Sequence, residues 1–282
     1  MRTKIICEIA SSHNGDIELA KALIKSAAIN GADLVKFQDW RALNVSINDP
    51  DKARYVKYQF PDSWYPILIP YCKEQGVKFL TTCFNVERVK FLAAQGLQTI
   101  KLASISLTNL ELIQECCKHF SEIILSTSMH EWKEIANVIN FLDLNAQDFT
   151  IMVCTANYPT VPEEAHLERL NTLKHMIFDC EQGSIGFSNH ALDLDVPKMA
   201  LCNNIKYLEV HFSLSRHLPQ ISHTMFEGGK PMTTHEISLE PHELKELADW
   251  RDKVEIMKGD GEFHNNLIEN LIKDKYANRY GK

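Results

Sequence analysis

Residues 207–213 (YLEVHFS) alternate between the two faces of an extended chain and are rich in β-branched and aromatic side chains, a pattern typical of a β-strand. His211 lies near the end of this run. An earlier run, residues 184–190 (SIGFSNH), has the same character and ends at His190. If the two strands are neighbours in one parallel sheet, both histidines lie at the same edge. Two neutral imidazoles that converge there can serve as metal ligands.

Strand-like runs recur eight times, at residues 4–10, 34–40, 78–84, 99–104, 122–127, 150–156, 184–189 and 207–213. Segments of helical periodicity alternate with them, at 17–30, 64–75, 87–95, 110–120, 131–142, 167–177 and 195–203, and a final helix is expected at 241–257. Eight βα units in about 250 residues are the dimensions of a (β/α)8 TIM barrel. The alternative is a doubly wound open sheet, but no GxGxxG motif follows the first strand.

We therefore expect an α/β protein with one barrel domain over residues 1–258 and a short polar tail over residues 259–282. The first helix should carry an apolar stripe and be capped by Asp16. The stripe is expected at Leu19, Ala22, Leu23, Ala27 and Ala28.

Composition excludes several classes of protein. The 282 residues are 45% apolar and 24% charged, with a net charge of -7 and a pI near 5.9, which argues against a nucleic-acid-binding surface. The eight cysteines show no CxxC spacing, so we interpret them as reduced and mostly buried thiols. No secretory signal and no run of about 18 apolar residues is present, so no membrane partner and a cytoplasmic location are expected.

In a barrel, catalytic side chains gather at the carboxyl ends of the strands. Lys36 and Lys101 lie on two predicted strands, among Ser and Thr residues that close neighbouring strands, and together they suggest a phosphate-binding cup. The alternative for Lys36 is a structural ion pair with Glu8. Lys101 is harder to explain structurally, because Ile100, Leu102 and Ala103 flank it.

The other strand-end residues each have two interpretations. A single histidine usually satisfies a hydrogen bond, but His190 and His211 together suggest a divalent ion such as manganese, iron or zinc. Glu8 can orient or activate water, or pair with Lys36. Tyr158, which precedes Pro159, either covers a ligand or packs as a core aromatic. The HNG sequence after the first strand is interpreted as a turn.

Seven motifs occur in an order that resembles the N-acetylneuraminate (sialic acid) synthase family, which includes the pseudaminic and legionaminic acid synthases. They are EIASSHNGDIELAKALIKSAAINGADLVKFQ, FLTTCF, TIKLAS, ILSTSM, NYPT, IGFSNH and LEVHFSL, and the match covers about residues 5–247. The resemblance implies a (β/α)8 barrel that condenses phosphoenolpyruvate with an amino-sugar aldehyde. The products are a nine-carbon 2-keto acid and phosphate, and the cofactor is a divalent metal, commonly Mn2+.

The resemblance also implies roles for individual residues. It makes His190 and His211 the metal ligands and matches Glu8 to the acidic residue near the metal-bound water. It matches Gln38 and Tyr158 to residues that face the sugar. It assigns Lys36, Thr82, Lys101, Ser104, Ser126 and Ser188 to phosphoenolpyruvate.

The sequence departs from the family pattern mainly on the acceptor side. Ser106 and Ser222 replace two acidic residues that meet the sugar, Asn189 replaces the Asp of an SDH motif, and Ala156 replaces an Asn. We therefore expect an acceptor other than N-acetylmannosamine. Two alternatives stay open: a non-catalytic barrel that binds phosphoenolpyruvate or sugar in a glycan pathway, and another aldol-type lyase or synthase acting on a phosphorylated keto acid.

The family's C-terminal antifreeze-like domain is not expected in these residues. Family members form dimers that are swapped through that domain. We therefore expect a homodimer that assembles differently, or a monomer.

Overall fold

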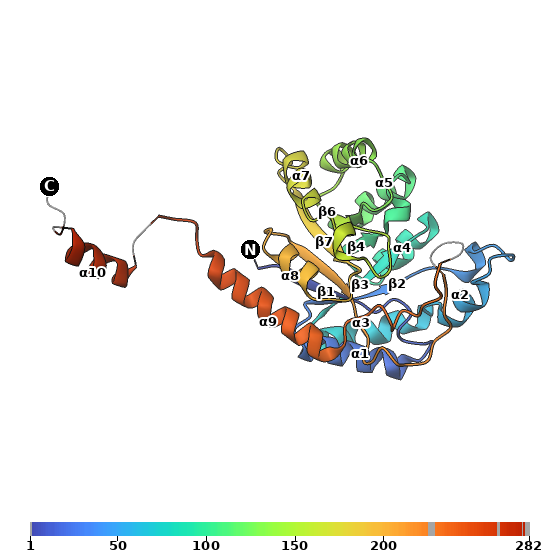
Figure 1. The fold of residues 1–282 in the computed structure, drawn as a ribbon. Helices are drawn as coiled ribbons and strands as arrows, with labels where there is room; N and C mark the ends of the chain where they lie inside the picture. The colour runs from blue at the N-terminus through green and yellow to red at the C-terminus, as the bar shows by residue number, and fades with distance from the viewer. Residues whose placement is uncertain (1, 225–228, 264–265, 278, 280–282) are drawn as a thin grey trace.

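A computed structural model of the protein describes residues 2–224, 229–263, 266–277 and 279. Eight parallel strands pair in sequence order and close into a barrel, and helices surround it (Figure 1). The strands are β1 (Lys4–Glu8), β2 (Leu34–Gln38), β3 (Lys78–Cys83), β4 (Thr99–Leu102), β5 (Glu122–Ser126), β6 (Asp148–Cys154), β7 (Gly183–Asn189) and β8 (Tyr207–His211). The predicted (β/α)8 barrel is confirmed.

Ten α-helices and four short 3-10 helices connect or follow the strands in the described residues. The α-helices are α1 (Ile17–Ile29), α2 (Lys52–Tyr58), α3 (Tyr65–Glu74), α4 (Val86–Ala94), α5 (Leu110–His119), α6 (Trp132–Asn145), α7 (Arg169–Met176), α8 (Asp195–Leu201), α9 (Pro241–Lys258) and α10 (Leu267–Tyr276). The 3-10 helices are η1 (Ala42–Asn44), η2 (Asp62–Trp64), η3 (Ser104–Ser106) and η4 (Pro162–Glu164). Helix α9 follows β8 and packs against α8 and α1, so it completes the outer layer of the barrel.

One apolar layer fills the inside of the barrel. It consists of Ile6, Leu34, Leu80, Ile124, Met152 and Tyr207, all nearly inaccessible to solvent. Side chains alternate along a strand, so the residue two positions further on points to the same side. The next inward-facing residues are therefore Glu8, Lys36, Thr82, Ser126, Cys154 and Glu209. This polar layer lies directly above an apolar floor, at the carboxyl ends of the strands.

Helix α1 begins and packs by ordinary helix rules. The Asp16 carboxylate accepts a hydrogen bond from the Glu18 amide at 2.9 Å, so the predicted N-cap is confirmed. The predicted stripe is partly wrong. The buried face is Ala20, Leu23, Ile24 and Ala27, whereas Ala22 is exposed. The spacing i, i+3, i+4, i+7 of the buried set is the one that presents a single face to the barrel.

The HNG turn after β1 is confirmed. Asn14 and Gly15 have φ angles of 52° and 76°, in the left-handed region. A Cβ atom at position 15 would lie 2.9 Å from the Lys57 carbonyl oxygen, so this close approach to α2 requires glycine. The turn therefore fixes the loop after β1 against the segment that follows β2.

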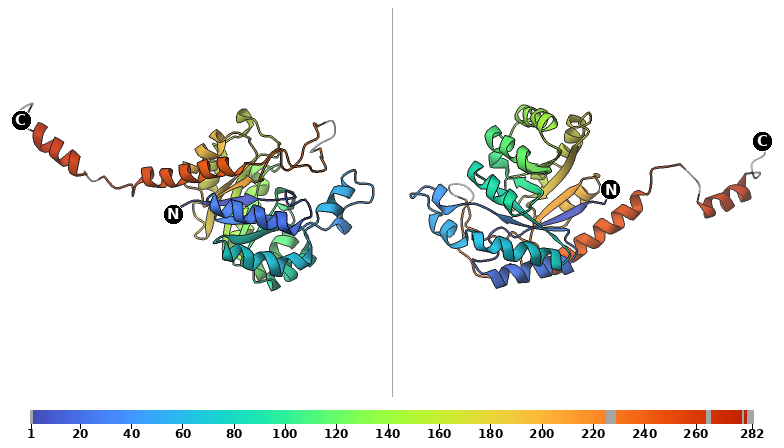
Figure 2. Two further views of the ribbon diagram at one scale, coloured as in Figure 1. Left: turned by 90° about the horizontal axis from the view of Figure 1, so that it is seen from below. Right: turned by 180° about the vertical axis from the view of Figure 1, so that it is seen from behind.

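Two helices were not predicted from the sequence. Helix α2 lies in the connection between β2 and α3, and α10 lies in the predicted polar tail. The expectation that the helix at 241–257 is the last one is therefore wrong. Asn266 and Glu269 form a capping box that starts α10, which stands apart from the barrel beyond the end of α9 (Figures 1 and 2). No helix in the described ranges is both long and apolar enough to span a bilayer.

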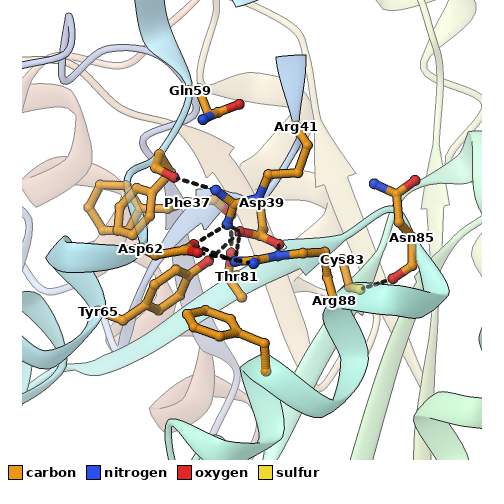
Figure 3. A network of polar contacts seen from close by, with 12 residues as sticks. Phe37, Asp39, Arg41, Gln59, Asp62, Tyr65, Thr81, Cys83, Asn85 and Arg88 are labelled. Carbon is orange, nitrogen blue, oxygen red and sulfur yellow. Dashed lines mark hydrogen bonds and ion pairs between the residues drawn. The ribbon is translucent and has the colours of Figure 1, made fainter. Parts of the chain in front are cut away.

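A buried carboxylate fixes the chain just beyond β2. Asp39 is inaccessible to solvent and accepts hydrogen bonds from the Tyr65 hydroxyl at 2.8 Å and from Arg88 Nε at 2.8 Å, and it also pairs with Arg41 (Figure 3). Asp62, the first residue of η2, binds the same two arginines. This network ties Asp39, which directly follows β2, to α3 and α4. It therefore holds the end of the strand that carries Gln38.

Candidate active site

A cavity of about 270 Å³ opens at the carboxyl ends of the strands. All eleven site residues predicted from the sequence line it: Glu8, Lys36, Gln38, Thr82, Lys101, Ser104, Ser126, Tyr158, Ser188, His190 and His211. They come from the ends of all eight strands or from the loops that follow them. The structure therefore brings the complete predicted set together, while their individual roles stay predictions.

Strand register explains why these side chains meet. Glu8 lies opposite Lys36 on β2 and opposite His211 on β8. Barrel closure between β8 and β1 is what makes the first and last strands neighbours. Further round the barrel, Thr82 on β3 lies opposite Lys101 on β4, and Ser188 on β7 lies opposite Glu209 on β8.

Two lysines and two glutamates form a buried network at the base of the cavity. Lys36 Nζ pairs with Glu8, donates to Thr82 Oγ1 at 3.0 Å and lies 3.4 Å from Glu209 Oε2. Lys101 Nζ lies 3.1 Å from both carboxylate oxygens of Glu209. The ion pair between Lys36 and Glu8, predicted as the structural alternative, is present. Lys101 has a structural partner as well.

The pKa values of the two carboxyl groups in this network are shifted in opposite directions. Burial alone would raise the pKa of Glu209, but Lys101 and Lys36 outweigh it and hold that pKa below its usual range. Burial raises the pKa of Glu8, because its one lysine partner compensates less. Burial lowers the pKa of Lys101 in spite of Glu209. Glu8 therefore takes up a proton more readily than Glu209.

Hydroxyl groups surround the lysines. Ser188 Oγ donates to Glu209 Oε1 at 3.0 Å. Ser104 and Ser128 share a hydrogen bond of 2.7 Å between their hydroxyls, and Ser128 also donates its amide to Ser104 Oγ. With Thr82 and Ser126, they supply donors of the type that a phosphate requires.

The two histidines meet at the edge of the cavity as predicted. Their ring centroids are 5.5 Å apart, and β7 and β8 are parallel neighbours. His190 Nδ1 bonds to the Thr155 carbonyl oxygen at 2.6 Å, which leaves Nε2 facing the Tyr158 hydroxyl at 2.8 Å. His211 Nδ1 is buried and has no hydrogen-bond partner in the part of the chain that the structure describes. Burial, together with His190, lowers the pKa of His211 well below its usual value, so its imidazole is neutral.

Tyr158 has the packing contact of one interpretation, and its position at the cavity is the one that the other interpretation requires, while its role toward a ligand stays a prediction. Its ring packs on His190 with a centroid separation of 3.9 Å, and it also lines the cavity. The peptide bond between Tyr158 and Pro159 is cis.

Glu209 and Cys154 also line the cavity but were not among the eleven predicted site residues. Glu209 is the counter-ion of both lysines, and the available signal was its position two residues before His211, on the same face of β8. Cys154 lines the cavity with Sγ 3.7 Å from His190 Nδ1. Its position two residues after Met152 on β6 was the corresponding signal. All eight cysteines are free, and five of them are buried, as predicted.

The four residues that depart from the family pattern lie in different parts of the structure. Asn189 is buried and bonds to the backbone of Ala191. Ala156 lines the active-site cavity and Ser106 lines an adjacent one. Ser222 is exposed.

The chain is similar to known synthases over most of its length. A sequence model of the NeuB family matches residues 23–263. The N,N'-diacetyllegionaminic acid synthase of Campylobacter jejuni is 32% identical over 278 residues, which cover 92% of this chain and 78% of that protein. The enzyme of the same name from Legionella pneumophila is 28% identical and is covered to 74%.

Solved structures agree with these matches. The spore coat polysaccharide biosynthesis protein SpsE of Bacillus subtilis is 28% identical, with a TM-score of 0.80 over 96% of this chain and 73% of that one. The sialic acid synthetase of Leptospira borgpetersenii has the same fold, with a TM-score of 0.87 at 23% identity over 100% of this chain and 94% of that one. The family and the enzyme class predicted from the motifs are confirmed: this chain belongs to the NeuB family.

Proposed function

We propose that this protein is a metal-dependent synthase that condenses phosphoenolpyruvate with an aldehyde sugar to give a 2-keto sugar acid and phosphate. The observation that carries the proposal is the pair of buried lysines, Lys36 and Lys101, held among hydroxyl groups above an apolar floor at the barrel mouth. Relatives named as synthases of diacetyllegionaminic and pseudaminic acids support it.

The lysines differ in how freely they can bind phosphate. An ammonium group has three donors. Those of Lys36 face Glu8, Thr82 and Glu209, whereas Lys101 has contacts only with Glu209 among the described carboxylates. Lys101 therefore keeps a donor for the phosphate, and Lys36 contributes mainly through its charge.

In the proposed reaction, the C2–C3 double bond of phosphoenolpyruvate opens as C3 bonds to the aldehyde carbon, and the aldehyde oxygen takes up a proton to become a hydroxyl. Water then adds to C2, and the bond between C2 and the phosphate oxygen breaks to release phosphate. Lys36 and Lys101 stabilise the departing phosphate. Glu8 accepts a proton from the attacking water, a role that suits a carboxylate with a raised pKa. Gln38 and Tyr158 line the side of the cavity where they can hydrogen-bond to the sugar.

The residues present fit a divalent ion with two protein ligands. His211 has a neutral imidazole with an unpartnered buried nitrogen, and the Thr155 carbonyl orients the His190 ring in the way that a backbone carbonyl orients a metal-bound imidazole. No group of three or more His, Cys, Asp or Glu side chains in the described residues is arranged to hold a metal. Water and substrate would complete the coordination. When bound, Mn2+ supplies Lewis-acid polarisation of the aldehyde.

The test is phosphate release from phosphoenolpyruvate with Mn2+ and a panel of aldoses. We expect turnover with at least one aldose, and little with N-acetylmannosamine because Ser106 and Ser222 remove two carboxylates from the acceptor side. Lys101→Met should abolish phosphate release, while the exposed control Lys118→Met should leave it unchanged. No release with any aldehyde would refute the proposed reaction.

One observation favours the non-catalytic alternative. The three donors of Lys36 already face partners within the protein, as expected for a structural network. Calorimetric titration with phosphoenolpyruvate, followed by the phosphate-release assay, separates the two functions. The synthase binds it in a Lys101-dependent manner and releases phosphate when an aldose is added. A non-catalytic barrel releases no phosphate, whether or not it binds phosphoenolpyruvate.

A further inference from the structure

A second cavity, of about 570 Å³, adjoins the active-site cavity. Gln38, Ala103 and Ile105 line both, so the two are contiguous. Arg54 on α2 and the ring of Trp40 lie on the far wall, and we call this space the Arg54 cavity. A substrate whose reacting end lies beside the histidines can extend into it.

The lining of the Arg54 cavity carries positive charge without a carboxylate. Among the described residues that line it, none is Asp or Glu, and the polar members include four amides, the hydroxyls of Tyr55 and Ser106, and two arginines. Arg41 is neutralised by Asp39 and Asp62 in the network of Figure 3. Ser106, which stands where the family resemblance implies an acidic residue, is one of the lining residues. The lining therefore suits an anion better than a neutral polyol.

Arg54 is buried and incompletely satisfied. Its side chain donates from Nη2 to Ser11 Oγ at 3.1 Å, but its Nε is buried without a partner, and the residue is only 8% exposed. In the described part of the chain it forms no ion pair, although Asp51 is close enough to act on it electrostatically. A buried guanidinium in this state lacks the charge-assisted bonds that would offset its desolvation.

Two other side chains also have a buried polar atom that lacks a hydrogen-bond partner in the described residues. These atoms are Ser12 Oγ and His223 Nδ1. Burial and then the charge of Arg54 lower the pKa of His223 to about 4, so His223 adds no competing charge. His223 is close enough to Arg54 to be affected by its charge, and Ser12 follows Ser11, the hydroxyl partner of Arg54, but neither Ser12 nor His223 lines the Arg54 cavity.

We propose that the Arg54 cavity binds an anionic group, a phosphate or a carboxylate, on the acceptor sugar at a position remote from its aldehyde, with Arg54 as the residue that determines this specificity. This inference rests on the proposed function, and it narrows the acceptor to an acidic aldose. Arg54 bonds to the anion through its two terminal nitrogens, since Nε is closed off from solvent, and this is a bidentate geometry that guanidinium groups offer to phosphates and carboxylates.

The experiment is calorimetric titration with polyols that lack an aldehyde, so that no reaction occurs. D-Mannitol, D-mannitol 1-phosphate and D-mannonate are compared at saturating phosphoenolpyruvate, which fills the lysine site. We expect an anionic polyol to bind about 10- to 100-fold more tightly than mannitol, as one or two charge-assisted bonds imply. The phosphate and carboxylate probes identify which anion is preferred.

Variants of α2 provide the controls. Arg54→Met should remove the preference for the anionic polyol, and Arg54→Lys should restore part of it. Lys57→Met, which removes an exposed cation from the same helix, should leave it unchanged. Circular dichroism verifies that each variant is folded.

The outcomes separate the two proposals. Equal binding of mannitol and both anions, or an anion preference that survives in Arg54→Met, would overturn the role of Arg54 whether or not the protein turns over. Preferred binding of an anion without phosphate release from any aldehyde would refute the synthase reaction and retain the anion site.

Discussion

Removing the negative charge of Glu209 tests the buried network most directly. In Glu209→Gln the side chain keeps its shape and can still accept the hydrogen bond from Ser188. Lys101 loses both of its carboxylate contacts at 3.1 Å, and Lys36 loses its contact at 3.4 Å. The amide nitrogen of the new side chain also cannot accept from an ammonium. The variant therefore leaves a buried lysine without its counter-ion.

The magnitude follows from this burial. Glu209 and Lys101 are 6% and 2% exposed, so solvent screens their interaction little. Breaking a buried ion pair by removing one partner costs about 3 to 5 kcal/mol. An exposed pair is worth about 0 to 1 kcal/mol. The matched control is Glu246→Gln, because the Glu246 side chain is 57% exposed and pairs with Lys198 at 2.6 Å on the surface.

The assay is urea-induced unfolding of the three proteins, monitored by circular dichroism at pH 7. We expect the free energy of unfolding of Glu209→Gln to fall by about 3 to 5 kcal/mol and that of Glu246→Gln by less than about 1 kcal/mol. Equal and small changes in both variants would show that Glu209 does not hold the lysine charges in the folded protein.

Three further predictions concern the metal, the Asp39 network and acid stability. His211→Ala should lose bound manganese and turnover together, and unchanged metal content by mass spectrometry would refute the ligand assignment. Asp39→Asn should lower the free energy of unfolding in urea by about 3 to 5 kcal/mol, since Arg41 and Arg88 lose a buried partner; an effect below about 1 kcal/mol would contradict this. Burial lowers the pKa of His13 to about 4, so the unfolded chain binds a proton there that the folded protein does not, and stability should fall as pH drops from about 6.5 to about 4. His13→Asn should reduce the pH dependence of the urea midpoint in that window, and an unchanged slope would exclude His13 as a contributor.

Local sequence patterns were sufficient for the barrel and for most of its site. The alternation of short β-branched runs with helical periodicity gave eight strands whose observed bounds differ from the expected ones by a few residues. Because strand-end residues of a parallel barrel all face the same end, the histidines and lysines could be placed together from chain order alone. Helix α10 was missed because its segment was interpreted from its polar composition, and α2 because it is short and lies in a connection.

The sequence by itself determined the fold, the family and eleven of the residues that line the cavity, since each depends on local periodicity or on a short motif. The tertiary structure alone decided how the charges pair. Glu209 on β8 reaches Lys101 on β4 and Lys36 on β2 because the side chains of these three strands point into the same interior of the closed barrel. It also decided that Arg54 is buried beside the active site without a partner at Nε. Pairing and desolvation of charged groups depend on distances between segments remote in sequence, and no local pattern encodes those distances.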